Sequence, residues 1–351
     1  MNIEVKKVVE NLHPLLTLIS GDPTTPIERM SSPDQAFINS IIFVPDEKAL
    51  KQVLKSQAAA LVISENLKNQ AKEWPRVLLS TPHLPLALSQ VGRHFFPVTT
   101  NKMPFDGERI HPSAVISQSA QIDDMAIIGP NTTIGAHCKI GKGVVIGPNT
   151  AIEANCVIGE KTHIHGQVSI SHGTQIGARC EVHPQTSLGT EGFGYAQDKE
   201  FNHYRITHYG RLILEDDVHI GAGVTMDRGT FADSRVGKGT IIDNMNHFGH
   251  NFICGERTIF VGGTIVAGSV TMGSRCVIGG RVSIAGHLKI CDNVHIAGMS
   301  GVTKDITEPG QYGGYPLQPL KNSLRSLSSL AALPEMRKTL AELVKKVNNK
   351  S

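Results

Sequence analysis

A row of aliphatic side chains at every sixth position runs through the middle of the chain. It begins at Ile110, continues without a break to Leu188, and resumes at Leu214 after an interruption. After a slip near Ala232, the row runs on to Val302, with Phe, Cys or Met at some positions. A period of six matches neither an α-helix, with about 3.6 residues per turn, nor an alternating strand. It fits a short strand followed by a turn, repeated as one side of a three-sided coil.

Three such units make a coil of 18 residues, and stacked coils form a prism whose interior holds the aliphatic row. Strands in a sheet lie about 4.8 Å apart, so residue i should lie beside residue i+18. Each buried aliphatic side chain contributes about 1.5 to 3 kcal/mol, so such a stack needs few aromatic residues. We therefore predict a mainly β protein, with a parallel β-helix over residues 106–308 and a loop inserted at about 189–212.

The two ends of the chain lack the six-residue period. In residues 1–105, apolar runs at 41–44, 60–63 and 77–79 predict strands, and helical patterns at 47–54 and 83–94 alternate with them. This order predicts a small α/β domain, either a recognition module or a cap. In residues 309–351, apolar helical faces lie on both sides of Pro334, which predicts two helices that pair or pack on a neighbouring subunit.

Composition narrows the class of protein. Only 5% of the residues are aromatic while 35 are glycine, which suits a narrow repetitive interior, and 40% hydrophobic residues exclude a disordered chain. We find no leader pattern and no apolar run of about 18 to 20 residues, so we expect a cytoplasmic protein with no transmembrane segment. We also expect no nucleic-acid partner. The six cysteines form no Cys-x-x-Cys pair, and we expect them to be small core residues.

Two histidines flank one inward position of the row. Phe248 occupies the row, so His247 and His250 should lie on an exposed face or turn. A neutral imidazole near pH 7 suits general-base chemistry. Asp243 lies seven residues before His250 and could orient it, but the sequence leaves this question open.

The period of 18 places two further residues near this pair. Gly268 lies one coil after His250, where a glycine leaves its backbone N–H accessible to a developing oxyanion. His287 lies two coils and one residue after His250, near the same edge. The His-x-x-His spacing with a third histidine also suits zinc held between subunits, as in prism-shaped carbonic anhydrases. That alternative gives the N-terminal domain and the loop no purpose, so we expect no metal and no other cofactor.

These features together resemble one family, the UDP-3-O-(3-hydroxyacyl)glucosamine N-acyltransferases of lipid A biosynthesis. The resemblance covers nearly the whole chain. A related O-acyltransferase of the same pathway typically has Asp after the second histidine and lacks the N-terminal domain, so Asn251 and residues 1–105 favour the N-acyl enzyme. The matching motifs are Gly192-Phe193-Gly194-Tyr195, Met226-Asp227-Arg228-Gly229, Ile241-Ile242-Asp243-Asn244, His250-Asn251, Ala285-Gly286-His287, Ile306-Thr307-Glu308-Pro309-Gly310 and Pro316-Leu317-Gln318-Pro319.

The resemblance implies a left-handed β-helix that assembles as a homotrimer with three shared sites. It implies that His250 is the general base and that the N–H of Gly268 holds the oxyanion. His287 would lie near the sugar-nucleotide phosphates or active-site water, with His247 and Asn251 also at the substrate. The acyl donor would be a (3R)-3-hydroxyacyl thioester of acyl carrier protein, used as co-substrate.

Positive charge is concentrated at the C-terminal end. Residues 318–351 hold seven Lys and Arg against two Glu, whereas the rest of the chain has slightly more acidic than basic residues. A solvated charged face is one interpretation. In the context of the resemblance, a docking surface for the acidic carrier protein is the other.

The chain departs from the family pattern in three places. In the uracil-binding segment Phe43 is kept, but Asp46 replaces Asn and Ala49 replaces Tyr, so a different nucleotide-sugar acceptor remains an alternative. Glu191 replaces the usual Asp before the Gly-Phe-Gly-Tyr loop. Gly301 stands where relatives can carry a bulky residue, which predicts room for a longer acyl chain. Besides the N-acyltransferase and an acyltransferase with a different acceptor, a third hypothesis is a prism that binds a carrier protein without catalysis. It predicts no turnover.

Overall fold

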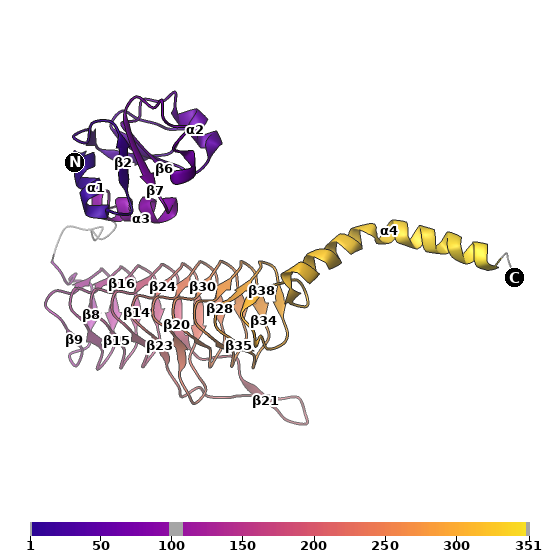
Figure 1. Cartoon of the computed structure of the whole chain (residues 1–351). Coiled ribbons are helices and arrows are strands. Elements are labelled where there is room, and N and C mark those ends of the chain that lie inside the picture. The colour runs from indigo at the N-terminus through magenta and orange to yellow at the C-terminus, as the bar shows by residue number, and fades with distance from the viewer. Residues whose placement is uncertain (1, 98–107, 349–351) are drawn as a thin grey trace. The chain divides into compact units, whose positions relative to one another are not determined.

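The computed structural model describes residues 2–97 and 108–348 (Figure 1). The chain divides into two compact units, residues 1–102 and 103–351, and each has a hydrophobic core of its own. The domain boundary predicted at residues 105 and 106 lies outside the described residues.

The N-terminal unit is built around one five-stranded sheet in the order β2-β7-β6-β5-β4. Strands β4 to β7 are parallel and β2 is antiparallel to β7. Side chains of α1 and α3 pack on one face of the sheet and those of α2 on the other, which is why its central strands read as continuous apolar runs. The predicted strands and helices are confirmed as β5, α2, β6, β7 and α3, and the other elements of this unit are additional. The elements are β1 (Ile3–Glu4), α1 (Val5–Leu12), β2 (Thr17–Ser20), β3 (Pro26–Ile27), β4 (Arg29–Ser31), β5 (Ser40–Val44), α2 (Glu47–Val53), β6 (Ala60–Ser64), the 3-10 turn η1 (Glu65–Leu67), β7 (Val77–Thr81) and α3 (Leu84–Phe95).

The second unit is a left-handed parallel β-helix with three faces, the exception to the usual right-handed crossover. Face 1 contains β10 (Ile127–Ile128), β13 (Val145–Ile146), β16 (His163–Ile164), β19 (Glu181–Val182), β24 (His219–Ile220), β27 (Ile241–Ile242), β30 (Ile259–Phe260), β33 (Val277–Ile278), β36 (Val294–Ile296), β38 (Gly310–Gly313) and the antiparallel β39 (Gln318–Pro319). Face 2 contains β8 (Val115–Ile116), β11 (Thr133–Ile134), β14 (Ala151–Ile152), β17 (Ser169–Ile170), β20 (Ser187–Thr190), β25 (Thr225–Asp227), β28 (His247–Phe248), β31 (Ile265–Val266), β34 (Ser283–Ile284) and β37 (Gly301–Val302). Face 3 contains β9 (Gln121–Ile122), β12 (Lys139–Ile140), β15 (Val157–Ile158), β18 (Gln175–Ile176), β23 (Leu212–Leu214), β26 (Ser234–Val236), β29 (Ile253–Cys254), β32 (Thr271–Met272) and β35 (Lys289–Ile290).

The predicted register of 18 residues is confirmed on each face. Ile134 pairs with Ile152, and Ile140 pairs with Ile158. Nearly every position of the aliphatic row is buried. The register changes at two places. Ile176 pairs with Leu214 because the loop lies between them, and Met226 pairs with Phe248, which is 22 residues away, at the slip near Ala232.

Small polar side chains two residues before the row are buried and hydrogen-bonded. The Thr132 hydroxyl donates to the carbonyl of Gly147 at 2.8 Å, 15 residues on, and the Cys138 thiol meets the Glu153 carbonyl at 3.0 Å in the same way. A buried donor without a partner costs free energy, and this repeated contact avoids that cost. Thr and Cys are therefore equivalent here, which confirms that most of the cysteines are small core residues. All six are free thiols.

Thiol reactivity follows from this burial. Burial raises the pKa of the Cys156 and Cys254 thiols to about 12, so they carry almost no thiolate at pH 8. Five cysteines are buried and Cys291 is partly exposed. We expect Cys291 to react rapidly with a chromogenic disulfide reagent in the folded protein, and the other five only after unfolding in guanidinium. Rapid reaction of a second thiol in the folded protein would contradict this burial.

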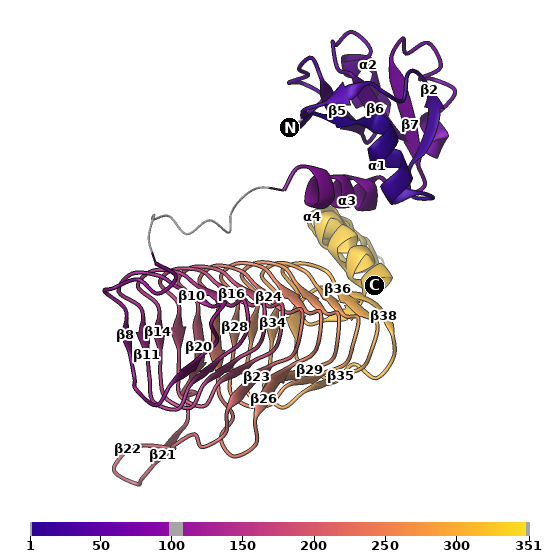
Figure 2. The ribbon, with the colours of Figure 1, turned by 90° about the vertical axis from the view of Figure 1, so that its left-hand side faces the viewer.

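The inserted loop leaves the prism as a β-hairpin. Strands β21 (Tyr195–Gln197) and β22 (His203–Arg205) pair in antiparallel fashion, and Figure 2 shows them projecting from the coils. Glu191 forms an ion pair with Arg205 across the base of this hairpin.

The C-terminal prediction of two helices is wrong. Helix α4 (Leu320–Asn348) is continuous, with Pro334 inside it, and Figure 1 shows it as one helix that bends near its middle. Proline removes one backbone hydrogen bond and crowds the preceding turn, at about 3 kcal/mol, but the flanking Leu, Ala, Lys and Arg residues favour helix on both sides. The helix contacts β38 and β39 at its start, and its apolar side chains beyond are exposed. Within the described residues, no helix has the length and apolarity needed to cross a membrane.

Candidate active site

The predicted pair of histidines lies at the end of β28, with His247 in the strand and His250 at the corner that follows it. Phe248 points into the core, and the chain then turns at Gly249, His250 and Asn251. The His250 carbonyl accepts a hydrogen bond from Ser269 N at 2.7 Å, which ties this corner to the next coil. The imidazole is half-buried and faces the base of the inserted hairpin.

Asn251 fixes the orientation and tautomer of His250. Its amide nitrogen donates to the Ala232 carbonyl at 3.2 Å, and its oxygen accepts from the Thr230 backbone and hydroxyl, each at 3.0 Å. That oxygen lies 3.0 Å from His250 Nδ1. Because an amide oxygen only accepts, Nδ1 carries the proton, and Nε2 keeps the lone pair that a general base needs.

Gly268 lies directly against the base, as the period of 18 predicts. A Cβ built on Gly268 would stand 2.6 Å from His250 Nε2, so no other residue fits without moving the ring. The flanking N–H groups of Ala267 and Ser269 donate to carbonyls of neighbouring coils. Among the described residues the Gly268 N–H has no acceptor, so a free donor and a free base lie side by side.

His287 occupies the same edge, as predicted, but does not contact His250. Its N–H donates to the Gly268 carbonyl at 3.0 Å, and its side chain is exposed. Asp243 lies at a different corner, where its carboxylate accepts the N–H groups of Asn244 at 2.8 Å and Gly262 at 3.0 Å. Asp243 therefore organises the backbone and does not orient the base.

The structure adds two residues that the sequence analysis did not select. His208, from the inserted segment, is 3% exposed, and its ring lies edge-on to His250 with centroids 5.3 Å apart. Asp227, at the end of β25, is 8% exposed and accepts a hydrogen bond from the Thr190 hydroxyl at 3.1 Å. Burial raises the pKa of the Asp227 carboxyl, and the nearby His247, His250 and His208 oppose that rise.

Comparison with known proteins shows which family the chain is part of. The chain is 37% identical over 350 residues to a UDP-3-O-acylglucosamine N-acyltransferase from Methylococcus capsulatus, covering 99% of this chain and 98% of that protein. The chain belongs to this acyltransferase family. A namesake from Coxiella burnetii is 35% identical over 328 residues, covering 93% of this chain and 94% of that protein.

Comparisons of domains and structures give the same architecture for this acyltransferase. The GMPPB C-terminal domain family matches residues 110–192, which are early coils of the prism. A crystal structure of Arabidopsis UDP-N-acetylglucosamine acyltransferase is similar in fold, with a TM-score of 0.52 and 23% identity. That match covers 58% of this chain and 71% of the Arabidopsis chain.

In this acyltransferase, Arg228 anchors the base of the inserted segment. Its guanidinium is 1% exposed and donates to the carbonyls of Gly189 and His172, each at 2.7 Å. Gly192 then packs against His250, since a Cβ there would lie 2.7 Å from the His250 Cβ. The buried cation thus holds the loop that covers one side of the general-base candidate.

The two residues predicted for nucleotide binding have different surroundings. Phe43 is nearly buried and lines a cavity of about 360 Å³ together with Met30, Pro33 and Leu88. Asp46 is the N-cap of α2, where its carboxylate accepts the N–H of Ala49 at 2.8 Å. Asp46 therefore has a structural role in addition to any contact with a ligand.

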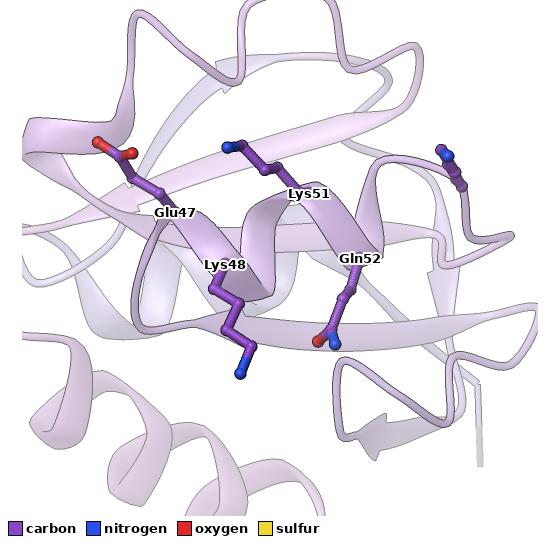
Figure 3. A pocket seen from close by; sticks show the side chains of 5 residues that line it. Glu47, Lys48, Lys51 and Gln52 are labelled. Atoms are coloured by element: carbon purple, nitrogen blue, oxygen red, sulfur yellow. The ribbon is translucent and has the colours of Figure 1, made fainter.

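A second hollow of about 660 Å³ lies on the outer surface of α2 and is unsuited to a nucleobase. Figure 3 shows Glu47 and Lys51 on one side of the helix and Lys48 and Gln52 on the other. These side chains diverge and form no common binding point. The apolar cavity beside Phe43 is the better place for a base.

Gly301 does not leave an open space. A Cβ built there would collide with the ring of Tyr315, from the turn between β38 and β39. The Tyr315 ring thus fills the space next to Gly301 within one chain, and room for a longer acyl chain stays a prediction.

The alternative metal site at His247, His250 and His287 is not assembled within one chain. Among the described residues, the group whose ligand atoms lie close enough for one ion is His163, His165 and Glu181, on face 1.

Proposed function

We propose that this acyltransferase moves a (3R)-3-hydroxyacyl chain from acyl carrier protein to the 2-amine of UDP-3-O-(3-hydroxyacyl)glucosamine. The observation that carries the proposal is the pairing of the His250 Nε2 with the Gly268 N–H, both without a partner in the part of the chain that the structure describes. Acyl transfer needs a base for the attacking amine and a donor for the developing oxyanion, and both are preorganised here.

In this mechanism the neutral 2-amine attacks the thioester carbonyl while His250 Nε2 removes one of its protons. Negative charge develops on the carbonyl oxygen, where the Gly268 N–H donates to it. Collapse of the tetrahedral intermediate breaks the carbon–sulfur bond and forms the amide. The imidazolium returns its proton to the departing thiolate, which leaves the carrier thiol and neutral His250.

Asp227 supports the charge that appears on the base. Its buried carboxylate lies near His247, His208 and His250, and it favours the imidazolium that forms during the reaction. His247 is held by the Thr225 hydroxyl, 2.7 Å from its Nδ1, and lies on the outer side of face 2 beside the base. His287 lies on the side of the site where the UDP-sugar acceptor would bind. Asn251 acts on the acceptor indirectly, because it orients His250.

Asp227→Asn should lower activity while raising stability. A buried carboxyl with a raised pKa is unfavourable when ionised, so it costs stability above its unfolded-state pKa, and the cost disappears as pH falls. We therefore expect the variant to be more stable than wild type at pH 7.5, with the difference shrinking towards pH 4. We expect turnover to fall about tenfold, or about 1.4 kcal/mol. Urea unfolding and initial rates measure the two effects, and an unstable, fully active variant would contradict this role.

Homotrimer formation is supported by the outer side of face 1. The outward-pointing strand positions of face 1 would usually carry polar residues, but several of them carry aliphatic ones. In a monomer these aliphatic side chains would be exposed to water. The exposed row on α4 adds a second unpartnered apolar surface, from Leu324 to Val347. The outward aliphatic residues of face 1 are Ile127, Val145, Ile241, Ile259 and Val277.

The positive charge of α4 supports binding of the acidic acyl carrier protein. Its described part exposes Lys and Arg at six positions against two Glu, while the apolar row occupies other positions of the same helix. An acidic partner is attracted by such a surface, and the attraction weakens as salt screens it.

The proposed reaction is tested by mass spectrometry with 3-hydroxyacyl carrier proteins of graded chain length. A product heavier by one hydroxyacyl group supports the proposal, and the preferred length shows where the acyl groove ends. If only a different nucleotide-sugar accepts the chain, the alternative acceptor is correct and the cavity beside Phe43 is where its base should bind. If no acceptor is acylated, the hypothesis of a non-catalytic prism gains support.

A further inference from the structure

Four histidines surround one glutamate on the outer side of face 1. His163, Glu181 and His219 stand in register on β16, β19 and β24, which are adjacent strands. His165 and His183 follow at the corner after the first two of these strands. The neighbouring outward positions, Val145 and Ile241, are aliphatic, so this polar group interrupts an apolar row.

The ligand atoms converge on Glu181. His165 Nε2 lies 3.0 Å from one of its carboxylate oxygens, and His219 Nδ1 lies 3.6 Å from the other. The nearest ligand atoms of His163, His165 and Glu181 all lie within 4.8 Å of one another. The rings of His163 and His165 stack with centroids 4.1 Å apart, and His165 stacks on His183 at 4.5 Å. Strand pairing holds these side chains in place without any ion.

The stacked arrangement suits a cation better than extra protons do. Two imidazolium rings repel one another when they stack as closely as His163 and His165, or His165 and His183. A bound metal ion instead requires neutral rings and an anionic carboxylate.

We propose that His163, His165 and Glu181 bind one divalent transition-metal ion, with Zn²⁺ as the best match. Two imidazoles and one carboxylate are a ligand set that zinc uses, with a fourth position open to water or a further side chain. Mg²⁺ and Ca²⁺ prefer oxygen ligands throughout, so they fit this group poorly. The site lies on face 1, whereas His250 lies at the corner between faces 2 and 3, and the proposal does not depend on the acyl-transfer reaction.

The test is zinc binding to the full-length, tag-free chain after treatment with a chelator. Equilibrium dialysis with metal analysis should find one tightly held Zn²⁺ per chain. Glu181→Gln and His163→Gln should each weaken binding by at least about 100-fold, since losing even an outer partner of a metal site costs about 10- to 100-fold. Glutamine keeps the size and polarity of both positions, and circular dichroism checks that each variant folds.

His295→Gln is the matched control, because His295 is another exposed outward histidine of face 1, further along the prism. It should bind zinc as wild type does. Co²⁺ provides a second measurement, since its visible absorption reports nitrogen and oxygen ligands and should disappear with Glu181→Gln. Unchanged zinc affinity in Glu181→Gln, or several weakly bound ions common to all the proteins, would overturn the proposal.

Discussion

His250→Ala should abolish most N-acylation while leaving the fold intact. The imidazole is half-buried at a corner, and its Nδ1 contacts Asn251 while its Nε2 faces the Gly268 position, so its removal deletes the base without opening the core. General-base catalysis contributes about 10²- to 10⁴-fold, and we expect kcat to fall by that amount. Initial rates of acylated UDP-sugar formation, followed by mass spectrometry, measure the loss.

Two companion variants make this experiment decisive. His250→Gln keeps a hydrogen-bonding side chain of similar length but no base, and it should lose as much activity as the alanine variant. His295→Ala removes an exposed histidine from face 1 and should retain the wild-type rate. If either His250 variant turns over at the wild-type rate with the same product, His250 is not the base.

The prism was predictable because its pattern is strict. One aliphatic position in six, repeated from Ile110 to Leu188, leaves a three-sided coil as the arrangement that buries nearly the whole row. The same period placed Gly268 against His250 and His287 on the same edge, because in a stacked coil the distance along the sequence becomes a position in space.

The period could not place residues that lie outside it. His208 belongs to the inserted segment, where no repeat sets the register, and it reaches His250 because Arg228 anchors the base of that segment. Asp227 stands in a recognised motif, but of the histidines near it His208 comes from the insertion, while His247 and His250 lie in the next coil, where the slip near Ala232 changes the register. Pro334 illustrates a different limit, because a local rule about helix breaking was outweighed by the helical preference of the residues around it.

The group around Glu181 was visible in the sequence and was not recognised. His163 and His165 are two residues apart, and Glu181 follows His163 by 18, which is the spacing that stacks residues on adjacent coils. A short spacing such as His247-x-x-His250 is visible along the chain, whereas Glu181 joins His163 and His165 only through the period of 18. In a repetitive fold, a ligand search along the stacking direction is the more informative one.

Gly268→Ala should inactivate the enzyme through a single methyl group. The added Cβ would stand 2.6 Å from His250 Nε2 and 2.8 Å from the adjacent ring carbon, so the imidazole must move away from the position that Asn251 gives it. Once the imidazole has moved, it also no longer stands beside the N–H that we assign to the oxyanion, so base and donor cannot act on the same carbonyl. Loss of one such donor costs about 10² to 10³ in kcat, and we expect a loss at least of that size.

Gly268→Ala should lower catalysis and not stability, because the group that must move is the His250 side chain, which lies half-buried at a corner. Gly280→Ala is the control, since its Cβ would meet the Gly262 carbonyl oxygen at 3.2 Å, a milder crowding at a corner away from His250. Both variants should unfold at similar urea concentrations, and only Gly268→Ala should lose turnover. If Gly268→Ala keeps wild-type kcat, then the Gly268 N–H and the adjacent position of the His250 ring have no part in acyl transfer, and another group must hold the oxyanion.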